Sequence, residues 1–348
     1  MKDFLDEQTK VIKEKVGNNP VLLLISGGVD STVVSALLLK ILKKDQIHLM
    51  YMDTGLMRKN ETEFVRANLE KLGAENIHVI MCEGDFLSAL KGVTDPEEKR
   101  RIIGDMYITI QEREAARLKA DPRTRLHDDY FLVQGSIRPD FLESGQKTGN
   151  INTDDQTGNN GVKKTSIVKS HHNVASPLVI AKRAAGRIIE PLAALYKDEV
   201  RELGRFLGVD EAVVNRHPFP GPGLAVRIIG EVTKEKCDIL READAVFIDK
   251  LKKRKSAVCG KSLYDDIWQA FTVLLPVRSV GVAGDVRKYG YVLALRAINS
   301  RDGMTAEVYP FETPDLLEIS ARITNSVKEI GRVTYDITGK PPATIEWE

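Results

Sequence analysis

A six-residue loop, SGGVDS at positions 26–31, restricts the fold of this chain more than any other feature. It follows an unbroken apolar run at 21–25, which is typical of a strand buried on both faces of a parallel sheet. Glycines let the backbone come close to an anion, and the helix N-terminus expected after the loop favours negative charge. The loop is neither GxxxxGK[ST] nor GxGxxG. Its position predicts a phosphate-binding turn with donors from Ser26, Gly27, Gly28, Ser31 and Thr32.

Strand and helix patterns alternate over the first 134 residues. Apolar runs predict strands at 21–25, 47–53, 77–81 and 130–134, and helical periodicity predicts helices at 32–44, 61–72 and 96–119. Such β-α-β-α alternation is typical of a doubly wound parallel sheet, in which ligands bind beyond the carboxyl ends of the strands. The predicted fold class is therefore α/β, with the loop where a ligand is expected.

The length of 348 residues indicates about two domains. The segment 216–223, RHPFPGPG, contains three prolines and two glycines and predicts a hinge. Beyond it, strands are expected at 225–229, 291–297 and 332–336, and helices at 234–251 and 314–328. This mixture predicts a second, smaller α+β domain, and we expect domains at 1–220 and 221–348.

Charge and cysteine content exclude several classes of function. Lys plus Arg total 51 and Asp plus Glu total 50, a net charge of +1, so no broad basic surface for nucleic acid or membrane is expected. No apolar run reaches the roughly 18 residues of a membrane span. The three cysteines, Cys82, Cys237 and Cys259, are too widely spaced for a CxxC zinc site or a disulfide framework. We therefore expect a cytoplasmic protein.

Further polar features lie where this fold would bind a ligand. Asp53 ends the second predicted strand, where it would line a nucleotide site or merely cap the next helix. Asp140 follows the fourth strand and offers a carboxylate for Mg²⁺. Residues 144–166 are too polar to bury a core, so they are either a passive insertion or part of an active-site lid. In isolation, the charged run around Arg100 indicates only a solvated helix face.

The loop resembles that of the PP-loop ATP pyrophosphatases, and further blocks make the chain similar to the GMP synthetase family. Between residues 26 and 348 the blocks occur in the family's order: SGGVDS, DPEEKR, QGSIRPD, KSHHN, KDEVR, RHPFPGPG, QAFTVLLPVRSVGVAGD and TGKPPATIEWE. The resemblance implies an adenine nucleotide alpha hydrolase-like fold and an AMP-forming carbon–nitrogen ligase of guanine nucleotide biosynthesis. In that reaction the 2-oxygen of xanthosine 5′-monophosphate (XMP) attacks ATP and pyrophosphate leaves on Mg²⁺. Ammonia then displaces AMP to give GMP.

The same resemblance implies roles for individual residues. It assigns ATP binding to Ser26, Gly27, Gly28, Asp30, Ser31, Thr32 and Asp53. It assigns XMP binding to Arg100, Gln269, Asp285, Lys340 and Glu346, and Mg²⁺ binding to Asp30 and Asp140. The catalytic residues that it implies are Asp30, Lys169 and His171, with Lys169 and His171 closing over the phosphates. The segment 141–176 would be the lid that keeps water from the adenylated intermediate.

The family also implies a homodimer formed by the C-terminal domain. Many members carry a glutamine amidotransferase domain before the synthetase domain, and none is expected here. Ammonia would then arrive free or from a separate glutaminase subunit. Two alternatives stay open: a PP-loop tRNA-thiolating enzyme, which would want a cysteine pair and a basic RNA-binding face, and a non-catalytic nucleotide-binding module.

Overall fold

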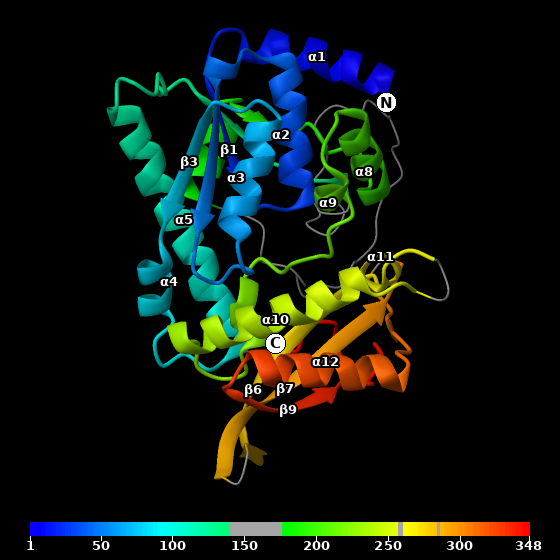
Figure 1. Ribbon diagram of the computed structural model, residues 1–348. Helices are drawn as coiled ribbons and strands as arrows, with labels where there is room; N and C mark the ends of the chain where they lie inside the picture. The colour runs from blue at the N-terminus through cyan, green and yellow to red at the C-terminus, as the bar shows by residue number, and fades with distance from the viewer. Residues whose placement is uncertain (139–175, 257–259, 284–285, 302) are drawn as a thin grey trace, which may run out of the picture. The chain divides into compact units, whose positions relative to one another are not determined.

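The computed structural model describes residues 1–138, 176–256, 260–283, 286–301 and 303–348 (Figure 1). The chain forms two compact units, each made of segments that are far apart in the sequence. Unit 1 contains Met1–Met52, Phe64–Ile80 and Ile108–Arg216, and unit 2 contains Asp53–Glu63, Met81–Tyr107 and His217–Glu348. No helix of the described residues is both long and apolar enough to cross a membrane. The chain passes from unit 1 to unit 2 for the last time between residues 216 and 217, and these two residues lie within the predicted hinge.

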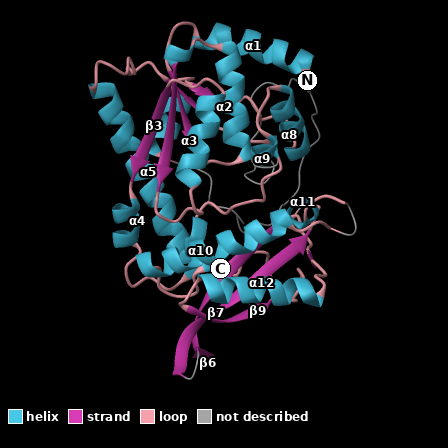
Figure 2. Ribbon diagram, viewed as in Figure 1, coloured by secondary structure: helices cyan, strands magenta, loops and turns pink. Residues whose placement is uncertain are grey.

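Unit 1 is built on a five-stranded sheet with the order β3-β2-β1-β4-β5. Figure 2 draws the strands in magenta and labels β3 of this sheet. Its strands are β1 (Val21–Ile25), β2 (Ile47–Asp53), β3 (Asn76–Met81), β4 (Phe131–Val133) and β5 (Ile188–Ile189). The central strand β1 is parallel to both β2 and β4, with Val21 opposite Ile47 on one side and Phe131 on the other. The predicted doubly wound parallel sheet is confirmed, and its strand order reverses between β1 and β4.

Helix α2 (Val29–Ile41) connects the loop to the core of unit 1. It begins before the predicted start at residue 32 and is buried along most of its length, because it contacts β1, α1 (Lys2–Val16) and α8 (Lys197–Phe206). Further helices that the structure describes in this part of the chain are η1 (Lys44–Gln46), α3 (Glu61–Lys71), α4 (Glu83–Ala89), α5 (Pro96–Ala120), α7 (Pro177–Ala184) and α9 (Glu211–Val214). Helix α5 begins at Pro96 as predicted, since the first turn of a helix needs no N–H there.

Unit 2 contains a smaller mixed sheet of β6 (Gln269–Ala283), β7 (Val286–Asn299), β8 (Glu307–Val308) and β9 (Ile330–Tyr335). Strand β7 is antiparallel to β6 and β8 and parallel to β9. Helix α10 (Lys234–Lys253) packs against β6 and α12 (Thr313–Ser326) against β9, and the two helices contact each other. The short elements η3 (Gly223–Arg227) and α11 (Leu263–Asp266) precede the sheet. The predicted α+β architecture is confirmed.

The strand expected at 225–229 is wrong. Residues Gly223–Arg227 form the 3₁₀ helix η3, because Gly223 takes a left-handed φ of 63° and the Leu224 N–H donates to the Leu56 carbonyl at 2.8 Å. The long strand β6 has no counterpart in the prediction, since Pro276 within it is typical of a strand breaker. An irregularity in the β6–β7 register between Leu274 and Arg278 accommodates that proline.

Candidate functional site

The predicted phosphate loop connects β1 to α2. Gly27 has a φ of 76°, a conformation that glycine adopts without strain, and Gly28 is the N-cap of α2. The hydroxyls of Ser26 and Ser31 lie 3.2 Å apart, and Ser26 Oγ accepts the Gly28 N–H at 3.3 Å. The Thr32 hydroxyl donates to the Gly28 carbonyl at 2.9 Å. These contacts shape the loop before the first turn of a 13-residue helix, whose free N–H groups and dipole attract an anion.

The loop lies where the strand order of the sheet reverses. Gly135, two residues beyond β4, approaches the backbone at the start of α2 so closely that a Cβ would lie 3.5 Å from the Ser31 nitrogen. The chain segments after β1 and β4 therefore meet beyond the carboxyl ends of their strands. Doubly wound folds bind nucleotides at this position.

Two cations of unit 1 contact the loop. Lys197, the first residue of α8, donates to both carboxylate oxygens of Asp30 at 2.7 and 2.6 Å. Arg216 donates from Nη1 to the Gly27 carbonyl at 2.8 Å, and its guanidinium lies 5.4 Å from the centre of the Phe64 ring. Both cations lie beside the turn in which a phosphate is expected.

Asp53 makes local contacts within unit 2. Its Oδ1 accepts the Gly55 N–H at 3.0 Å, and its Oδ2 accepts the Thr62 hydroxyl at 2.5 Å. Its main-chain carbonyl accepts the Cys82 N–H at 2.9 Å. Both carboxylate oxygens thus bind neighbouring polar groups, and the role of Asp53 in ATP binding stays a prediction.

Unit 2 brings two of the predicted XMP residues together. Gln269 Nε2 donates to Glu346 Oε1 at 2.8 Å. Arg227 binds the same carboxylate with Nε at 3.0 Å and Nη2 at 2.8 Å. The Arg227 side chain has no exposed surface, and its guanidinium lies 5.1 and 4.1 Å from the ring centres of Phe219 and Phe271. The Glu346 carboxylate is therefore held in one orientation.

The other two described XMP residues keep donors available. Arg100 pairs with Glu97 one turn earlier on α5, and its side chain is 22% exposed. Lys340 donates from Nζ to the Gly303 carbonyl at 2.7 Å. An ammonium has three donors and a guanidinium five, so each residue can also bind an anion.

Four predicted site residues lie outside the described residues: Asp140, Lys169, His171 and Asp285. Positions 141–175 of the predicted lid lie outside them as well. Its last residue, Ser176, is the N-cap of α7 and accepts the Val179 N–H at 3.1 Å. Among the described residues, no group of three or more His, Cys, Asp or Glu side chains is arranged to hold a metal ion.

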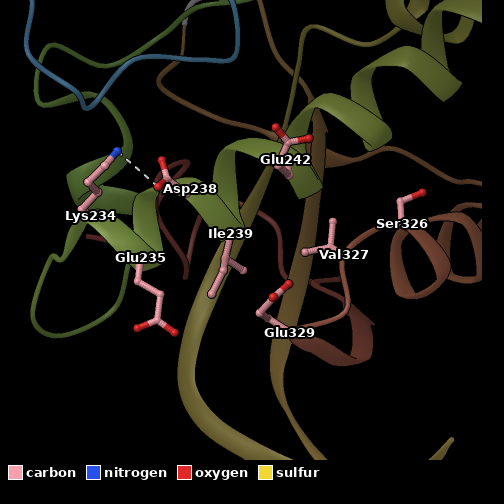
Figure 3. Close-up of a pocket in the computed structure, with 8 residues that line it drawn as sticks. All are labelled: Lys234, Glu235, Asp238, Ile239, Glu242, Ser326, Val327 and Glu329. Carbon is pink, nitrogen blue, oxygen red and sulfur yellow. Dashed lines mark ion pairs between the residues drawn. The ribbon is translucent and has the colours of Figure 1, made fainter.

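A groove of about 580 Å³ in unit 2 is unsuited to phosphate (Figure 3). Its lining includes the carboxylates Glu235, Asp238, Glu242 and Glu329, together with Lys234, which pairs with Asp238 at 3.3 Å. Carboxylates outnumber cations in this lining, although Lys59 pairs with Glu242 at 2.6 Å, and their excess disfavours an anion. None of the predicted site residues that the structure describes lines this groove.

Three cations near the candidate sites had no predicted role: Lys197, Arg216 and Arg227. Lys197 begins the KDEVR block, Arg216 begins RHPFPGPG, and Arg227 follows that block. The sequence could have drawn attention to these residues, because each is a basic residue inside or just after a block shared with the family. It could not identify the group that each one binds, because Lys197 and Asp30 are 167 positions apart and Arg216 and Gly27 are 189 positions apart.

A parallel sheet with a glycine–serine loop at its reversal point defines an α/β protein of the PP-loop, nucleotide-binding class. Residues 256–347 match the family model GMP synthase C terminal domain, and residues 8–109 match the model Asparagine synthase. The chain is 46% identical to the GMP synthase [glutamine-hydrolyzing] of Thermotoga petrophila, over 99% of this chain and 62% of that protein. The protein of the same name from Chlorobium chlorochromatii is 46% identical over 100% of this chain and 61% of its own length. The chain is therefore similar over its whole length to proteins named GMP synthase.

The chain spans about three fifths of the length of these curated relatives, 62% and 61% in the two comparisons. A solved structure with a similar arrangement is the NH3-dependent NAD synthetase from Campylobacter jejuni. It is 17% identical with a TM-score of 0.41, and the likeness covers 61% of this chain and 76% of that one. A likeness of this size carries no argument about function.

Proposed function

We propose that this chain catalyses the ATP-dependent amination of XMP to GMP, with AMP and pyrophosphate as the other products. Loop 26–31 binds ATP, which is cleaved between its α and β phosphates, and unit 2 binds XMP. The observation that carries the proposal is a phosphate loop at the reversal point of the sheet, in a chain 46% identical over 99% of its length to a protein named GMP synthase. The name of that relative, GMP synthase [glutamine-hydrolyzing], supports the product and a nitrogen that derives from glutamine.

The described residues suit the chemistry of adenylation. The 2-oxygen of a purine is a poor leaving group, and transfer of AMP to it makes a good one. Negative charge grows on the departing pyrophosphate, so preorganised N–H groups and cations stabilise the transition state. The N-terminus of α2, Lys197 and Arg216 supply these groups beside the loop.

Asp30 is the described residue best suited to hold Mg²⁺. Its carboxylate is 29% exposed and binds the Lys197 ammonium, so this position accepts a positive charge. Mg²⁺ commonly takes one or two protein carboxylates and completes its coordination with water and phosphate oxygens. Asp30, together with Asp140, would therefore supply enough protein ligands for the ion, and bound Mg²⁺ would neutralise the leaving pyrophosphate.

Binding of XMP is assigned to Arg100, Gln269, Asp285, Lys340 and Glu346. The Lys340 ammonium suits the nucleotide phosphate, and the Glu346 carboxylate suits the N–H edge of the purine. Gln269 supports this assignment because its amide already orients Glu346.

Closure over the phosphates is assigned to Lys169, His171 and the segment 141–176 on the resemblance to the family alone. Ammonia is proposed as the nitrogen nucleophile, either free or from a separate glutaminase. A homodimer and a cytoplasmic location are further parts of the proposal.

The two cysteines that the structure describes give no support to the tRNA-thiolating alternative. Cys82 and Cys237 are both buried, and burial raises the pKa of the Cys237 thiol to about 12. Neither side chain offers an accessible thiolate for sulfur transfer.

The decisive assay supplies the purified chain with ATP, Mg²⁺ and XMP and compares ammonium with glutamine. We expect GMP, AMP and pyrophosphate in equal amounts with ammonium, and no product with glutamine alone. Omission of XMP should abolish pyrophosphate release. Absence of GMP with ammonium and all three ligands would reject the proposed function.

A further inference from the structure

Three lysine and arginine side chains among the described residues have no exposed surface, and all three bind one segment of the chain. These side chains are Lys99 on α5, Arg227 on η3 and Arg296 on β7. Each contacts residues 336–348, which we call the tail. Cations are rarely buried because desolvation is costly, so three of them on one segment require an explanation.

Lys99 and Glu348 satisfy each other almost completely. The Lys99 ammonium forms an ion pair with the Glu348 carboxylate and donates to the carbonyls of Ala225 at 3.3 Å and Ile228 at 2.8 Å. The second carboxylate oxygen of Glu348 accepts the Gly230 N–H at 3.2 Å. The side chain of Lys99 is 0% exposed and that of Glu348 is 8% exposed. This geometry fixes the tail to both α5 and the chain after η3.

The rest of the tail is fixed in the same way. Arg296 donates to the carbonyl of Thr338 at 2.5 Å and to that of Thr344 at 3.0 Å, and pairs with Asp336 at 3.1 Å. Arg227 binds Glu346 through two hydrogen bonds. The tail therefore has a defined position although it contains no helix or strand of its own beyond an isolated bridge at Lys340.

Stability alone does not account for these contacts. A buried ion pair contributes little over well-packed apolar side chains of the same volume, because desolvation offsets the attraction. It does impose a single geometry, which is the better attested use of buried polar groups. Here the geometry joins two neighbours of the pair: Arg100 follows Lys99 on α5, and Glu346 lies two residues before Glu348.

We propose that the Lys99–Glu348 pair positions the tail so that Arg100 and Glu346 act on one purine nucleotide. Lys99 and Glu348 are positioning residues and do not touch the ligand. This inference rests on the proposed function, since Arg100 and Glu346 are the XMP residues of that proposal. It adds a specificity element that lies wholly within unit 2.

The test measures the dissociation constants of XMP and of ATP with Mg²⁺ by calorimetry, for the full chain at a temperature where every variant is folded. Two variants are compared with the wild type: Glu348→Gln, which leaves the Lys99 charge unpaired, and the double variant Lys99→Met/Glu348→Gln, which removes both charges. A matched control is Arg254→Met, which breaks the pair of Arg254 with Asp315 at 2.9 Å elsewhere in unit 2.

We expect Glu348→Gln to weaken XMP binding at least tenfold, with ATP binding changed less than twofold. The double variant should recover the melting temperature but not the XMP affinity, since its tail is no longer fixed in register. Arg254→Met should lower the melting temperature with XMP affinity unchanged. Wild-type XMP affinity in Glu348→Gln, or its recovery together with stability in the double variant, would overturn the positioning role. If the wild-type chain itself does not bind XMP, the proposed function fails, and that result is distinct from the other two.

Discussion

Unit 2 should lose stability as the pH falls below neutral, and His217 is the cause. Its imidazole is 5% exposed and stacks on Tyr264 with ring centres 3.8 Å apart. Its Nδ1 accepts the Ala270 N–H at 3.1 Å, so the Nε2–H donates to the Tyr264 carbonyl at 2.7 Å. A second proton, on Nδ1, would point at the Ala270 N–H, which would then lose its acceptor. Burial lowers the pKa of His217 from 6.5 to about 4, and the nearby Arg58 charge adds to this effect.

The sign follows from proton binding. The folded protein binds this proton less tightly than the unfolded chain, so stability is complete above pH 6.5 and is lost as the pH falls towards 4. A shift of roughly 2.5 pKa units corresponds to about 3 kcal/mol in full, of which about 2 kcal/mol is lost by about pH 5. Trp268 and Trp347, the two tryptophans of the sequence, both belong to unit 2. Tryptophan fluorescence during urea unfolding at about pH 7.5 and about pH 5 therefore measures this loss.

Tryptophan fluorescence is chosen because it reports on unit 2, whereas His48 lies in unit 1 and also has a pKa lowered to about 4, chiefly by burial. A probe of the whole chain would combine the effects of the two histidines. His217→Asn retains an acceptor for the Ala270 N–H and does not titrate in this range, so its free energy of unfolding should change far less between the two pH values. His127→Asn, at an exposed position, is the control and should keep the wild-type difference. If His217→Asn loses as much stability as the wild type, His217 is not the titrating group and the reasoning is refuted.

Three further substitutions test other parts of the structure. Lys340→Ala should weaken XMP binding while leaving ATP binding largely intact, and an equal loss of both affinities in calorimetry would contradict its assignment to the XMP phosphate. Gly223→Ala should lower the stability of unit 2 by about 3 kcal/mol or more, because its φ is 63° and the new Cβ would overlap the Leu56 carbonyl; an unchanged urea midpoint would disprove the strain. Lys197→Ala should change the stability of unit 1 by about 1 kcal/mol or less, since its pair with Asp30 is partly exposed, yet slow XMP-dependent pyrophosphate release more than tenfold. Full activity in that variant would remove Lys197 from the phosphate site.

Local patterns account for the parts of the fold that were predicted well. The strands at 21–25 and 47–53 match β1 and β2, because continuous apolar runs bounded by polar residues leave little choice of boundary. The helix starting at Pro96 was equally clear. The prediction was wrong at η3 and incomplete at β6, where the outcome depends on a tertiary hydrogen bond from Leu224 and on a register shift around Pro276. Neither cause is local.

The candidate site residues divide in the same way into those set by local sequence and those set by contacts between distant residues. The phosphate loop is contiguous, so its glycines, hydroxyls and flanking elements could be identified from adjacent letters of the sequence. Asp53 had two alternative roles, a wall of the nucleotide site or a cap of the next helix, and sequence alone could not choose between them. The partners of Asp30 and Glu346 come from positions more than 75 residues away, since Lys197 is 167 positions from Asp30, Gln269 is 77 from Glu346 and Arg227 is 119 from Glu346.

Two of the three buried cations that contact the tail could have been noticed in the sequence. Arg227 and Arg296 each lie within an otherwise apolar run, GLAVRIIG and VLALRAIN, and a basic residue in such a run is buried with its neighbours unless the strand or helix turns it outward. Each buried cation then needs an acceptor that is equally protected from water. The tail supplies the acceptors Asp336, Glu346 and Glu348. The sequence of the tail has no helical or strand periodicity from which the direction of these side chains could be predicted. A cation inside an apolar run, together with unpatterned acids elsewhere in the chain, is therefore the signal that would have led to this cluster from the sequence.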